Sequence, residues 1–250
     1  MNAGLSIDEW LGAHRRNDFK ELGRFLISRC ISRHEKILAF EKADHEKRHW
    51  YAKLWEKIRP RTLDELSSMN VTFITFNYDR SLEHALITMA RATYCSNNDH
   101  ESMVNSIPII HVHGQLGRLE WQTSRDKLTI RKYGEERNAS LEHRCDSGIH
   151  FLGDEAAESD FDIARAHLQR ANEIHFLGFG FHPDNLKRFS IDQVKAEVIS
   201  GTCIGIGSTE YESLSRRFGG RLFLKRMNIE GDEGYIHHML DRLENSGTQY

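Results

Sequence analysis

Apolar side chains recur at helical spacing in the first quarter of the chain. Within residues 17–59, positions such as Phe19 and Leu22 repeat every three or four residues, separated by Lys, Glu, Arg and His. A second group, Trp50–Ile58, is rich in aromatic residues and continues the pattern until Pro60 stops it. We therefore expect two amphipathic helices whose aromatic side chains pack on a core.

The pattern changes to short apolar runs after residue 70. Val71–Phe76 is β-branched and aromatic, and a helical pattern follows it directly, which predicts a strand leading into a helix. Further strands are predicted at residues 107–113, 173–179, 202–206 and 222–224, and further helices at residues 156–171, 210–218 and 235–243. Strands that alternate with helices predict an α/β fold, with a mostly parallel sheet and helices on both faces.

These elements indicate one α/β domain with a helical segment before it. We expect residues 1–69 to form the N-terminal helical segment and residues 70–244 to form the α/β core. Within the core, residues 115–153 are polar and irregular, which is typical of an insertion or a lid. Residues 245–250 are expected to form a frayed tail.

Composition and charge argue against several classes of protein. The formal net charge is -3, so no basic excess suggests a nucleic-acid partner. No run approaches the ~18 apolar residues of a membrane helix, and the N-terminus lacks the order of a signal peptide. The 4 cysteines form no CxxC pair and the histidines show no metal-ligand spacing, which argues against a zinc module, a disulfide framework and a bound metal. A reducing cytoplasm fits this composition best.

Small and polar residues follow the predicted strands. They are Asn77 and Asp79 after the first strand, His113 and Gly114 at the end of the second, Gly178 and Gly180 at the end of the third, and Ser208 after the fourth. Ligands of parallel α/β sheets bind beyond the carboxyl ends of the strands, where glycine permits a close approach of the backbone. We expect Asn77 and Asp79 to form one half of an active site and His113 to form the other.

Each of these residues also has a simpler structural interpretation. Asp79 can cap the helix that follows it by accepting hydrogen bonds from the first backbone amides. Asn77 can close a turn, and His113 can be a hydrogen-bonded histidine of the core. Each Gly-x-Gly can be only a turn, and neither completes a G-x-G-x-x-G fingerprint. The occurrence of Asn77, Asp79 and His113 together at strand ends favours the functional interpretation.

Three segments together resemble the Sir2 superfamily, and more closely its prokaryotic Sir2-like branch than the sirtuin deacylases. They are FITFNYDRSLEHAL, PIIHVHGQLG and IHFLGFGFHPDN, in this order, and the resemblance covers about residues 70–220. The resemblance implies a Rossmann-like fold, NAD as the substrate and no required metal. The chemistry that it implies is cleavage of the bond between nicotinamide and ribose, as in the NADases of antiphage defence.

The resemblance also implies a role for each candidate residue. Asn77 would contact the nicotinamide ribose and help place an attacking water, and Asp79 would support the nicotinamide end of the pocket or orient Asn77. His113 would act as a general base on a ribose hydroxyl or on water, for which the near-neutral pKa of histidine is suited. The residues expected to bind the cofactor are Thr75, Phe76, Gly114, Gly178, Gly180 and Ser208.

Two departures from the family pattern qualify these expectations. Sirtuin deacylases carry a four-cysteine zinc module, and the absence of cysteine pairs here favours NAD hydrolysis over deacylation. The family also opens with a strand and a Gly-Ala-Gly-x-Ser loop that holds the pyrophosphate. Residues 1–6 resemble that loop only superficially, because no strand precedes them. We therefore expect the first βα unit to be missing, as in a fragment, a misassigned start, a degenerate paralogue or a subunit completed by a partner.

The leading functional hypothesis is a Sir2-like NAD+ glycohydrolase of antiphage defence. The alternative is a non-catalytic or degenerate subunit that binds NAD or ADP-ribose, as a homo-oligomer or with a partner subunit. NAD-dependent protein deacylation is a third hypothesis, and it has the least support. None of the three involves nucleic acid or a membrane.

Overall fold

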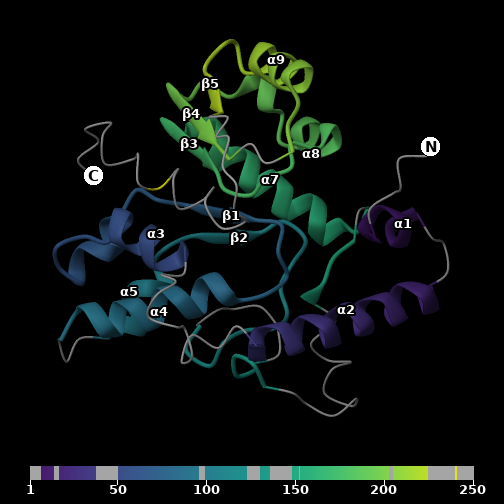
Figure 1. The fold of residues 1–250 in the computed structure, drawn as a ribbon. Helices are drawn as coiled ribbons and strands as arrows, with labels where there is room; N and C mark the ends of the chain where they lie inside the picture. The colour runs from purple at the N-terminus through teal and green to yellow at the C-terminus, as the bar shows by residue number, and fades with distance from the viewer. Residues whose placement is uncertain are drawn as a thin grey trace. The chain divides into compact units, whose positions relative to one another are not determined.

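The computed structural model describes residues 7–13, 17–37, 50–95, 99–122, 130–135, 148–151, 153–202, 205–224 and 240 of the 250-residue chain (Figure 1). The chain divides into two compact units. Unit 1 comprises Met1–Ala52 and Arg59–Asp160, and unit 2 comprises Lys53–Ile58 and Phe161–Tyr250. Two helices, α3 (Trp50–Ile58) and α7 (Glu155–Arg170), contain residues of both units.

Unit 1 combines one pair of strands with several helices. Its other elements are α1 (Ile7–Ala13), α2 (Asn17–Ile37), the 3₁₀ helix η2 (Asp64–Ser68), β1 (Phe73–Thr75), α4 (Ser81–Thr93), α5 (His100–Asn105) and β2 (Ile109–His111). β1 and β2 are parallel, with Phe73 opposite Ile109 and Thr75 opposite His111. Because the strands are parallel and in register, the segments that follow Thr75 and His111 leave the sheet at the same edge.

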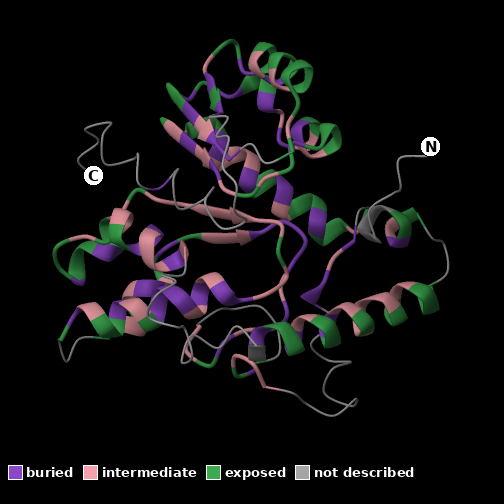
Figure 2. Cartoon of the chain, in the orientation of Figure 1, coloured by how far each residue is buried: buried purple, intermediate pink, exposed green. Residues whose placement is uncertain are grey.

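The interior of unit 1 contains an apolar helix face and a buried ion pair. On α4, residues such as Leu86 and Ile87 are buried while the opposite face is exposed (Figure 2). The fully buried guanidinium of Arg80, directly before α4, bonds both carboxylate oxygens of Glu35 on α2, at 3.0 and 2.5 Å. Arg80 also donates to the backbone carbonyl of Arg131 at 2.8 Å. These bonds fix the start of α4, and therefore the segment between β1 and α4.

Unit 2 contains a three-stranded sheet. Its other elements are β3 (Glu173–Phe176), α8 (Pro183–Arg188), the 3₁₀ helix η4 (Ile191–Gln193), β4 (Val198–Gly201), α9 (Ser208–Arg217) and β5 (Leu222–Leu224). The strand order is β3-β4-β5, and both pairs are parallel. Aromatic rings fill the core, where the Phe176 ring centroid lies 5.1 Å from that of Phe181 and 5.8 Å from that of Phe218.

The predicted α/β class, with parallel strands and helices before the first strand, is confirmed. The strands of the described residues form two sheets, β1-β2 and β3-β4-β5, where the sequence suggested one. β1, β2 and β3 are shorter than predicted, whereas β5 has the predicted bounds.

Several boundaries differ from the sequence prediction. The fourth strand was predicted at residues 202–206, but β4 spans Val198–Gly201. The side-chain oxygen of Thr202 accepts from the backbone N–H of Gly178, at 2.8 Å, so Thr202 closes the end of the sheet instead of extending β4. Helix α9 begins at Ser208 rather than at residue 210. The short helices α1, α5 and α8 were not predicted, and apart from residue 240 the predicted helix 235–243 and the tail lie outside the described residues.

Candidate functional site

Hydrogen bonds fix the backbone that follows β1. The backbone N–H of Asn77 donates to Thr75 Oγ1 at 3.1 Å, and the backbone carbonyl of Asn77 lies 2.7 Å from Nδ1 of His111. Asn77 is exposed, whereas its neighbour Phe76 is half-buried. The strand end therefore presents Asn77 to solvent from a backbone that is held on both sides. We call residues 75–79 and 111–114 the unit 1 strand edge.

Asp79 lies one residue before Arg80, the N-cap residue of helix α4, and its side chain bonds the first residue of the helix. Its Oδ1 accepts a hydrogen bond from the backbone N–H of Ser81 at 3.0 Å. The hydroxyl of Ser81 in turn lies 2.9 Å from the hydroxyl of Tyr133. Burial, together with the nearby carboxylates of Glu35 and Asp79, raises the pKa of Tyr133 to about 12. Tyr133 is therefore a neutral hydrogen-bonding group at physiological pH.

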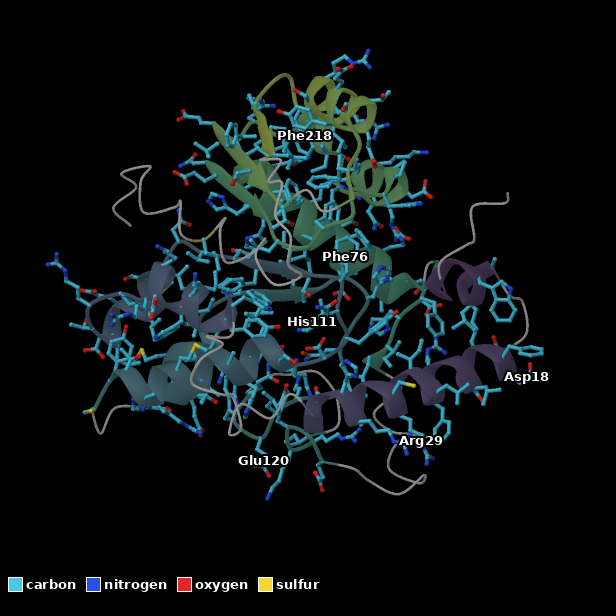
Figure 3. All side chains as sticks on the ribbon, in the orientation of Figure 1. Asp18, Arg29, Phe76, His111, Glu120 and Phe218 are labelled. Atoms are coloured by element: carbon cyan, nitrogen blue, oxygen red, sulfur yellow. The ribbon has the colours of Figure 1, made fainter. Side chains whose placement is uncertain are left out.

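His111, the last residue of β2, bridges two acceptors in the interior of unit 1 (Figure 3). Its Nε2 lies 2.8 Å from Oε1 of Glu83 on α4, and its Nδ1 lies 2.7 Å from the carbonyl oxygen of Asn77. Both side chains are buried, with exposed fractions of 8% for His111 and 1% for Glu83. A backbone carbonyl and an ionised carboxylate only accept hydrogen bonds, so both ring nitrogens must donate. The geometry fits an imidazolium–carboxylate pair.

The electrostatic surroundings agree with this ionisation. Burial alone would lower the pKa of His111, but the Glu83 carboxylate and the bonds to Glu83 and Asn77 outweigh burial and raise it. Burial alone would raise the pKa of Glu83, but His111 and Arg80 outweigh burial and lower it. Both shifts favour the charged form of the group, in agreement with the imidazolium–carboxylate geometry.

His113 lies two residues after His111, in an aromatic environment. It is buried, and its ring centroid lies 5.7 Å from that of Phe76 and 6.2 Å from that of Tyr78. Its backbone carbonyl accepts from the N–H of His150 at 2.8 Å. The unit 1 strand edge thus brings together the predicted residues Asn77, Asp79 and His113.

Gly114 is required by the packing of unit 1. Its φ is +76°, a conformation that favours glycine, and an added Cβ would lie 1.9 Å from the carbonyl oxygen of Gly148. The next residue, Gln115, donates its N–H to the same carbonyl at 2.9 Å. These contacts give Gly114 a structural reason to be glycine, separate from any approach of a nucleotide.

The remaining predicted residues lie in unit 2, at what we call the unit 2 strand edge, residues 177–180 and 205–208. Gly178 has a φ of +66°, and an added Cβ at Gly178 or Gly180 would meet nothing within 4 Å. Ser208, the first residue of α9, is exposed. The loop after Gly180 is strained, because the buried Phe181 has a φ of 51°. Its packing against Phe176 and Phe179, with ring centroids 5.1 Å away in both cases, holds it there.

Comparison with known families identifies the chain. The sequence model of the SIR2-like domain matches residues 71–198, which is more than half of the chain. The protein belongs to the SIR2-like domain family. The matched range contains every predicted site residue except Ser208. No curated protein and no solved structure matches the chain.

Membership in the SIR2-like family confirms the resemblance found in the sequence and the Rossmann-like α/β fold that it implied. SIR2-like domains use NAD, so the chain is an NAD-binding protein of the Sir2 superfamily. Among the described residues, no helix is long and apolar enough to cross a membrane.

The pair His111–Glu83 of this SIR2-like domain was not predicted. The sequence does contain a signal for it, because Glu83 precedes the buried Leu86 and Ile87 by three and four residues and therefore occupies the apolar face of α4. A carboxylate on such a face needs a buried partner. The sequence does not show which of the nearby histidines supplies that partner.

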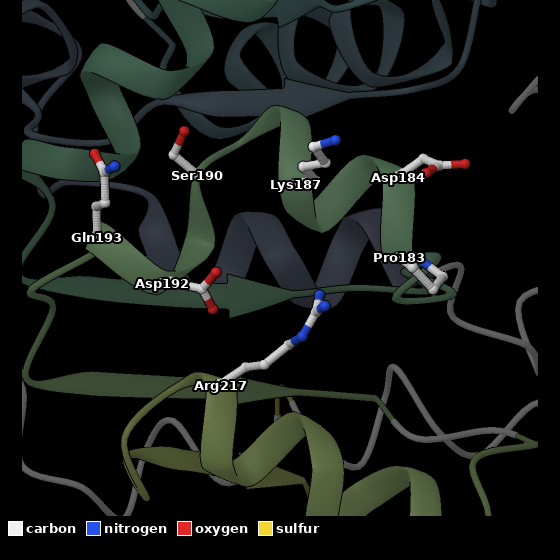
Figure 4. A pocket seen from close by; sticks show the side chains of 7 residues that line it. All are labelled: Pro183, Asp184, Lys187, Ser190, Asp192, Gln193 and Arg217. Atoms are coloured by element: carbon white, nitrogen blue, oxygen red, sulfur yellow. The ribbon is translucent and has the colours of Figure 1, made fainter.

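Within the described part of the chain, the predicted residues of the SIR2-like domain coincide neither with a metal-binding group nor with the cavity found in unit 2. Among the described residues, no group of three or more His, Cys, Asp or Glu side chains could hold a metal ion. A cavity of about 360 Å³ lies in unit 2 (Figure 4), and it is lined by Pro183, Asp184, Lys187, Ser190, Asp192, Gln193 and Arg217. Its lining carries both charge signs, and it contains none of the predicted site residues.

Proposed function

We propose that the protein is an NAD+ glycohydrolase, which cleaves NAD+ to nicotinamide and ADP-ribose. The observation that supports this most strongly is the shared strand edge of unit 1. Asn77 follows β1 and His113 follows β2, and the two strands are parallel and in register. An amide and an imidazole at one sheet edge, in a domain family that uses NAD, suit a hydrolytic reaction at the ribose.

His113 is the proposed general base. An imidazole can take a proton from water or from a ribose hydroxyl near neutral pH. Its burial between the rings of Phe76 and Tyr78 limits its movement and the access of bulk water. In the proposed reaction the water oxygen bonds to the ribose carbon, its proton passes to His113, and the electron pair of the broken carbon–nitrogen bond leaves with nicotinamide.

Asn77 and Asp79 are the proposed contacts at the nicotinamide end. The reaction develops positive charge on the ribose, and a fixed carboxylate nearby lowers the energy of that state. One oxygen of Asp79 accepts from the backbone N–H of Ser81, which fixes the position of its carboxyl group. Asn77 is exposed on a fixed backbone, so its amide can orient the attacking water. Thr75, Phe76 and Gly114 complete the proposed contacts of unit 1.

Gly178, Gly180 and Ser208 are the proposed contacts to the phosphates and the adenosine. The open space around the two glycines leaves room for a ligand. The N–H of Gly178 is already bonded to Thr202 Oγ1, so the phosphate contacts are assigned to the N–H of Gly180 and to the N-terminus of α9, since backbone N–H groups at a helix N-terminus bind phosphate oxygens well.

The purified full chain should release nicotinamide from NAD+, measured by chromatography. We expect Asn77→Ala and His113→Ala each to lower kcat by at least ~100-fold. His34→Ala, an exposed histidine on α2, is the matched control and should keep the wild-type rate. Equal release by the wild type and by the Asn77→Ala, His113→Ala double variant would contradict the proposal.

If the activity serves antiphage defence, infected bacteria that produce the chain should lose NAD, and those that produce the double variant should not.

The second candidate function is NAD or ADP-ribose binding without turnover, in a homo-oligomer or with a partner subunit. The bond from the Ser81 N–H to Asp79 and the burial of His113 favour it, because both give these residues a structural purpose. It predicts that NAD or ADP-ribose raises the melting temperature while no nicotinamide appears. Equal melting temperatures with and without saturating ligand would contradict it.

A further inference from the structure

We infer that His111 is a positioning residue, which fixes the backbone of Asn77 by bridging it to the Glu83 carboxylate in its doubly protonated form. The inference rests on the proposed function and extends it, since it assigns the orientation of Asn77 to a residue outside the predicted site. The bridge joins β2, α4 and the segment after β1 through two bonds, of 2.7 and 2.8 Å.

The chemistry of the bridge requires a charged ring. A neutral imidazole has one N–H donor, so it satisfies either the Asn77 carbonyl or the Glu83 carboxylate, but not both. Loss of the second proton would leave a buried acceptor unpaired or drive the proton onto Glu83, and each alternative is costly in a buried site. The position of the Asn77 backbone is therefore coupled to the protonation of His111.

Other bonds around Asn77 do not replace this one. The bond from the Asn77 N–H to Thr75 Oγ1 is local, within two residues. The bond from Ser81 to Asp79 fixes the start of α4, and the N–H of Leu116 donates to the Tyr78 carbonyl at 2.9 Å. The His111 bridge is the link from Asn77 itself to another strand and to α4.

The charged groups that face the bridge come from several elements. On α4, Glu83 is the direct partner; at the strand edge, Asp79 also favours the imidazolium. On α7, Asp160 lies within electrostatic reach of His111, and its own pKa is raised by burial. Arg80 acts on Glu83. On α3, burial and then the Asp79 and Glu83 carboxylates raise the pKa of Tyr51, so this residue stays neutral.

The directions of the pKa shifts of His111 and Glu83 determine how the bridge responds to pH. The pKa of His111 is raised, so the imidazolium persists above the ordinary histidine pKa and is lost as the pH rises through the raised value. The pKa of Glu83 is lowered, so its carboxylate is lost only as the pH falls below the ordinary range of glutamate. We therefore expect kcat to fall on the alkaline side when the bridge loses its proton.

The first test measures the protonation of the His111 ring in the absence of nucleotide. The full chain is labelled in its histidine rings and titrated by NMR, and the signals of His111 are assigned from their loss in His111→Gln. We expect both ring nitrogens of His111 to carry a proton at neutral pH, and Glu83→Gln to shift its titration to lower pH. A singly protonated ring at neutral pH would overturn the inference.

The second test measures kcat against pH for nicotinamide release. We expect His111→Gln to lower kcat about tenfold or more, with a smaller change in KM, and to lose the alkaline decline. Glu83→Gln should move that decline to lower pH, and the matched control His34→Gln should keep the wild-type profile. The His111→Gln, Glu83→Gln double variant can pair two neutral amides, so it should regain thermal stability without regaining kcat. Recovery of the wild-type kcat and pH profile in the double variant would overturn the inference.

These outcomes separate the inference from the proposed function. A wild-type chain that releases no nicotinamide contradicts the proposed function, and the ring titration and the NAD-induced melting shift then test the bridge. The rise in melting temperature that NAD induces should become smaller at alkaline pH in the wild type but not in His111→Gln. A wild-type enzyme whose kcat and alkaline decline survive in His111→Gln contradicts the inference alone.

Discussion

Gly114 and Gly178 both follow a parallel strand and both have a positive φ, but their surroundings differ. An added Cβ would lie 1.9 Å from a carbonyl oxygen at Gly114, and it would meet nothing within 4 Å at Gly178. The unit 1 strand edge is filled by backbone and by hydrogen-bonded titratable groups, whereas the unit 2 strand edge leaves its backbone accessible. Glycine thus allows close packing at the unit 1 strand edge and leaves open space at the unit 2 strand edge. The groups that can transfer protons lie at the unit 1 strand edge.

Two histidines show the same contrast. In unit 1, the Glu83 carboxylate and the Asn77 carbonyl outweigh burial and raise the pKa of His111. In unit 2, burial outweighs Glu173 and lowers the pKa of His175, whose Nδ1 lies 2.8 Å from the hydroxyl of Ser200. The direction of a histidine pKa shift therefore depends on whether its acceptor partners outweigh burial, as they do at His111 but not at His175.

The largest effect is expected for Gly114→Ala. Steric overlap and the left-handed φ should together cost about 4 kcal/mol or more of the free energy of unfolding. Urea denaturation of the full chain measures this loss, and hydrogen exchange of the unit 1 amides locates it. Gly180→Ala is the matched control, because its added Cβ meets open space. A loss of less than about 1 kcal/mol at Gly114 would remove the contrast between the two edges.

The second effect concerns the ion pair that supports the unit 1 edge. Arg80→Met leaves the Glu35 carboxylate buried without its guanidinium partner, so we expect a loss of about 3 kcal/mol in the free energy of unfolding. The Arg80→Met, Glu35→Met double variant should recover a large part of this loss. A single variant as stable as the wild type would show that Arg80 does not support the segment between β1 and α4.

A smaller effect is expected at the open edge. Gly178→Ala must adopt a φ of +66°, which should cost about 1 kcal/mol of the free energy of unfolding. If this backbone contacts the nucleotide, the NAD-induced rise in melting temperature should also shrink in Gly178→Ala and in Gly180→Ala. An unchanged rise in both variants would argue against their proposed contact with NAD.

The smallest effect is the loss of stability that His175 in unit 2 causes as the pH falls. Because the pKa of His175 is lowered, the unfolded chain takes up its proton first, so this residue reduces stability as the pH falls from the ordinary histidine value through the lower folded value. His175→Gln should flatten the decline of the melting temperature over that range. A steeper decline in His175→Gln would contradict the assignment of a neutral ring.

The local sequence pattern was sufficient to predict the strand ends. The β-branched run before Asn77 and the apolar run before His113 place β1 and β2, and the parallel class follows from their alternation with helices. The same pattern misplaced β4, because the apolar residues from Thr202 to Ile206 suit a strand as well as Val198–Gly201 does. The choice depends on which residues pair with β3 and β5, and pairing is a tertiary property.

The buried bridge shows a different limit. His111 and His113 stand two residues apart in one motif, and local spacing does not decide which of them meets Glu83. The partner depends on how α4 packs beside β2. Likewise, the steric reason for Gly114 is the carbonyl of Gly148, 34 positions later. Local patterns predict the elements, whereas contacts between distant segments determine the ionisation of the site.

The central claim is that the unit 1 strand edge hydrolyses NAD+. Nicotinamide release from NAD+ by the full wild-type chain, compared with His113→Ala at neutral pH, tests it most directly. The account predicts continuous release by the wild type and at least ~100-fold slower release by His113→Ala, with similar unfolding curves for the two proteins. Equal rates in the two proteins, or no release by a folded wild type that binds NAD, would contradict it.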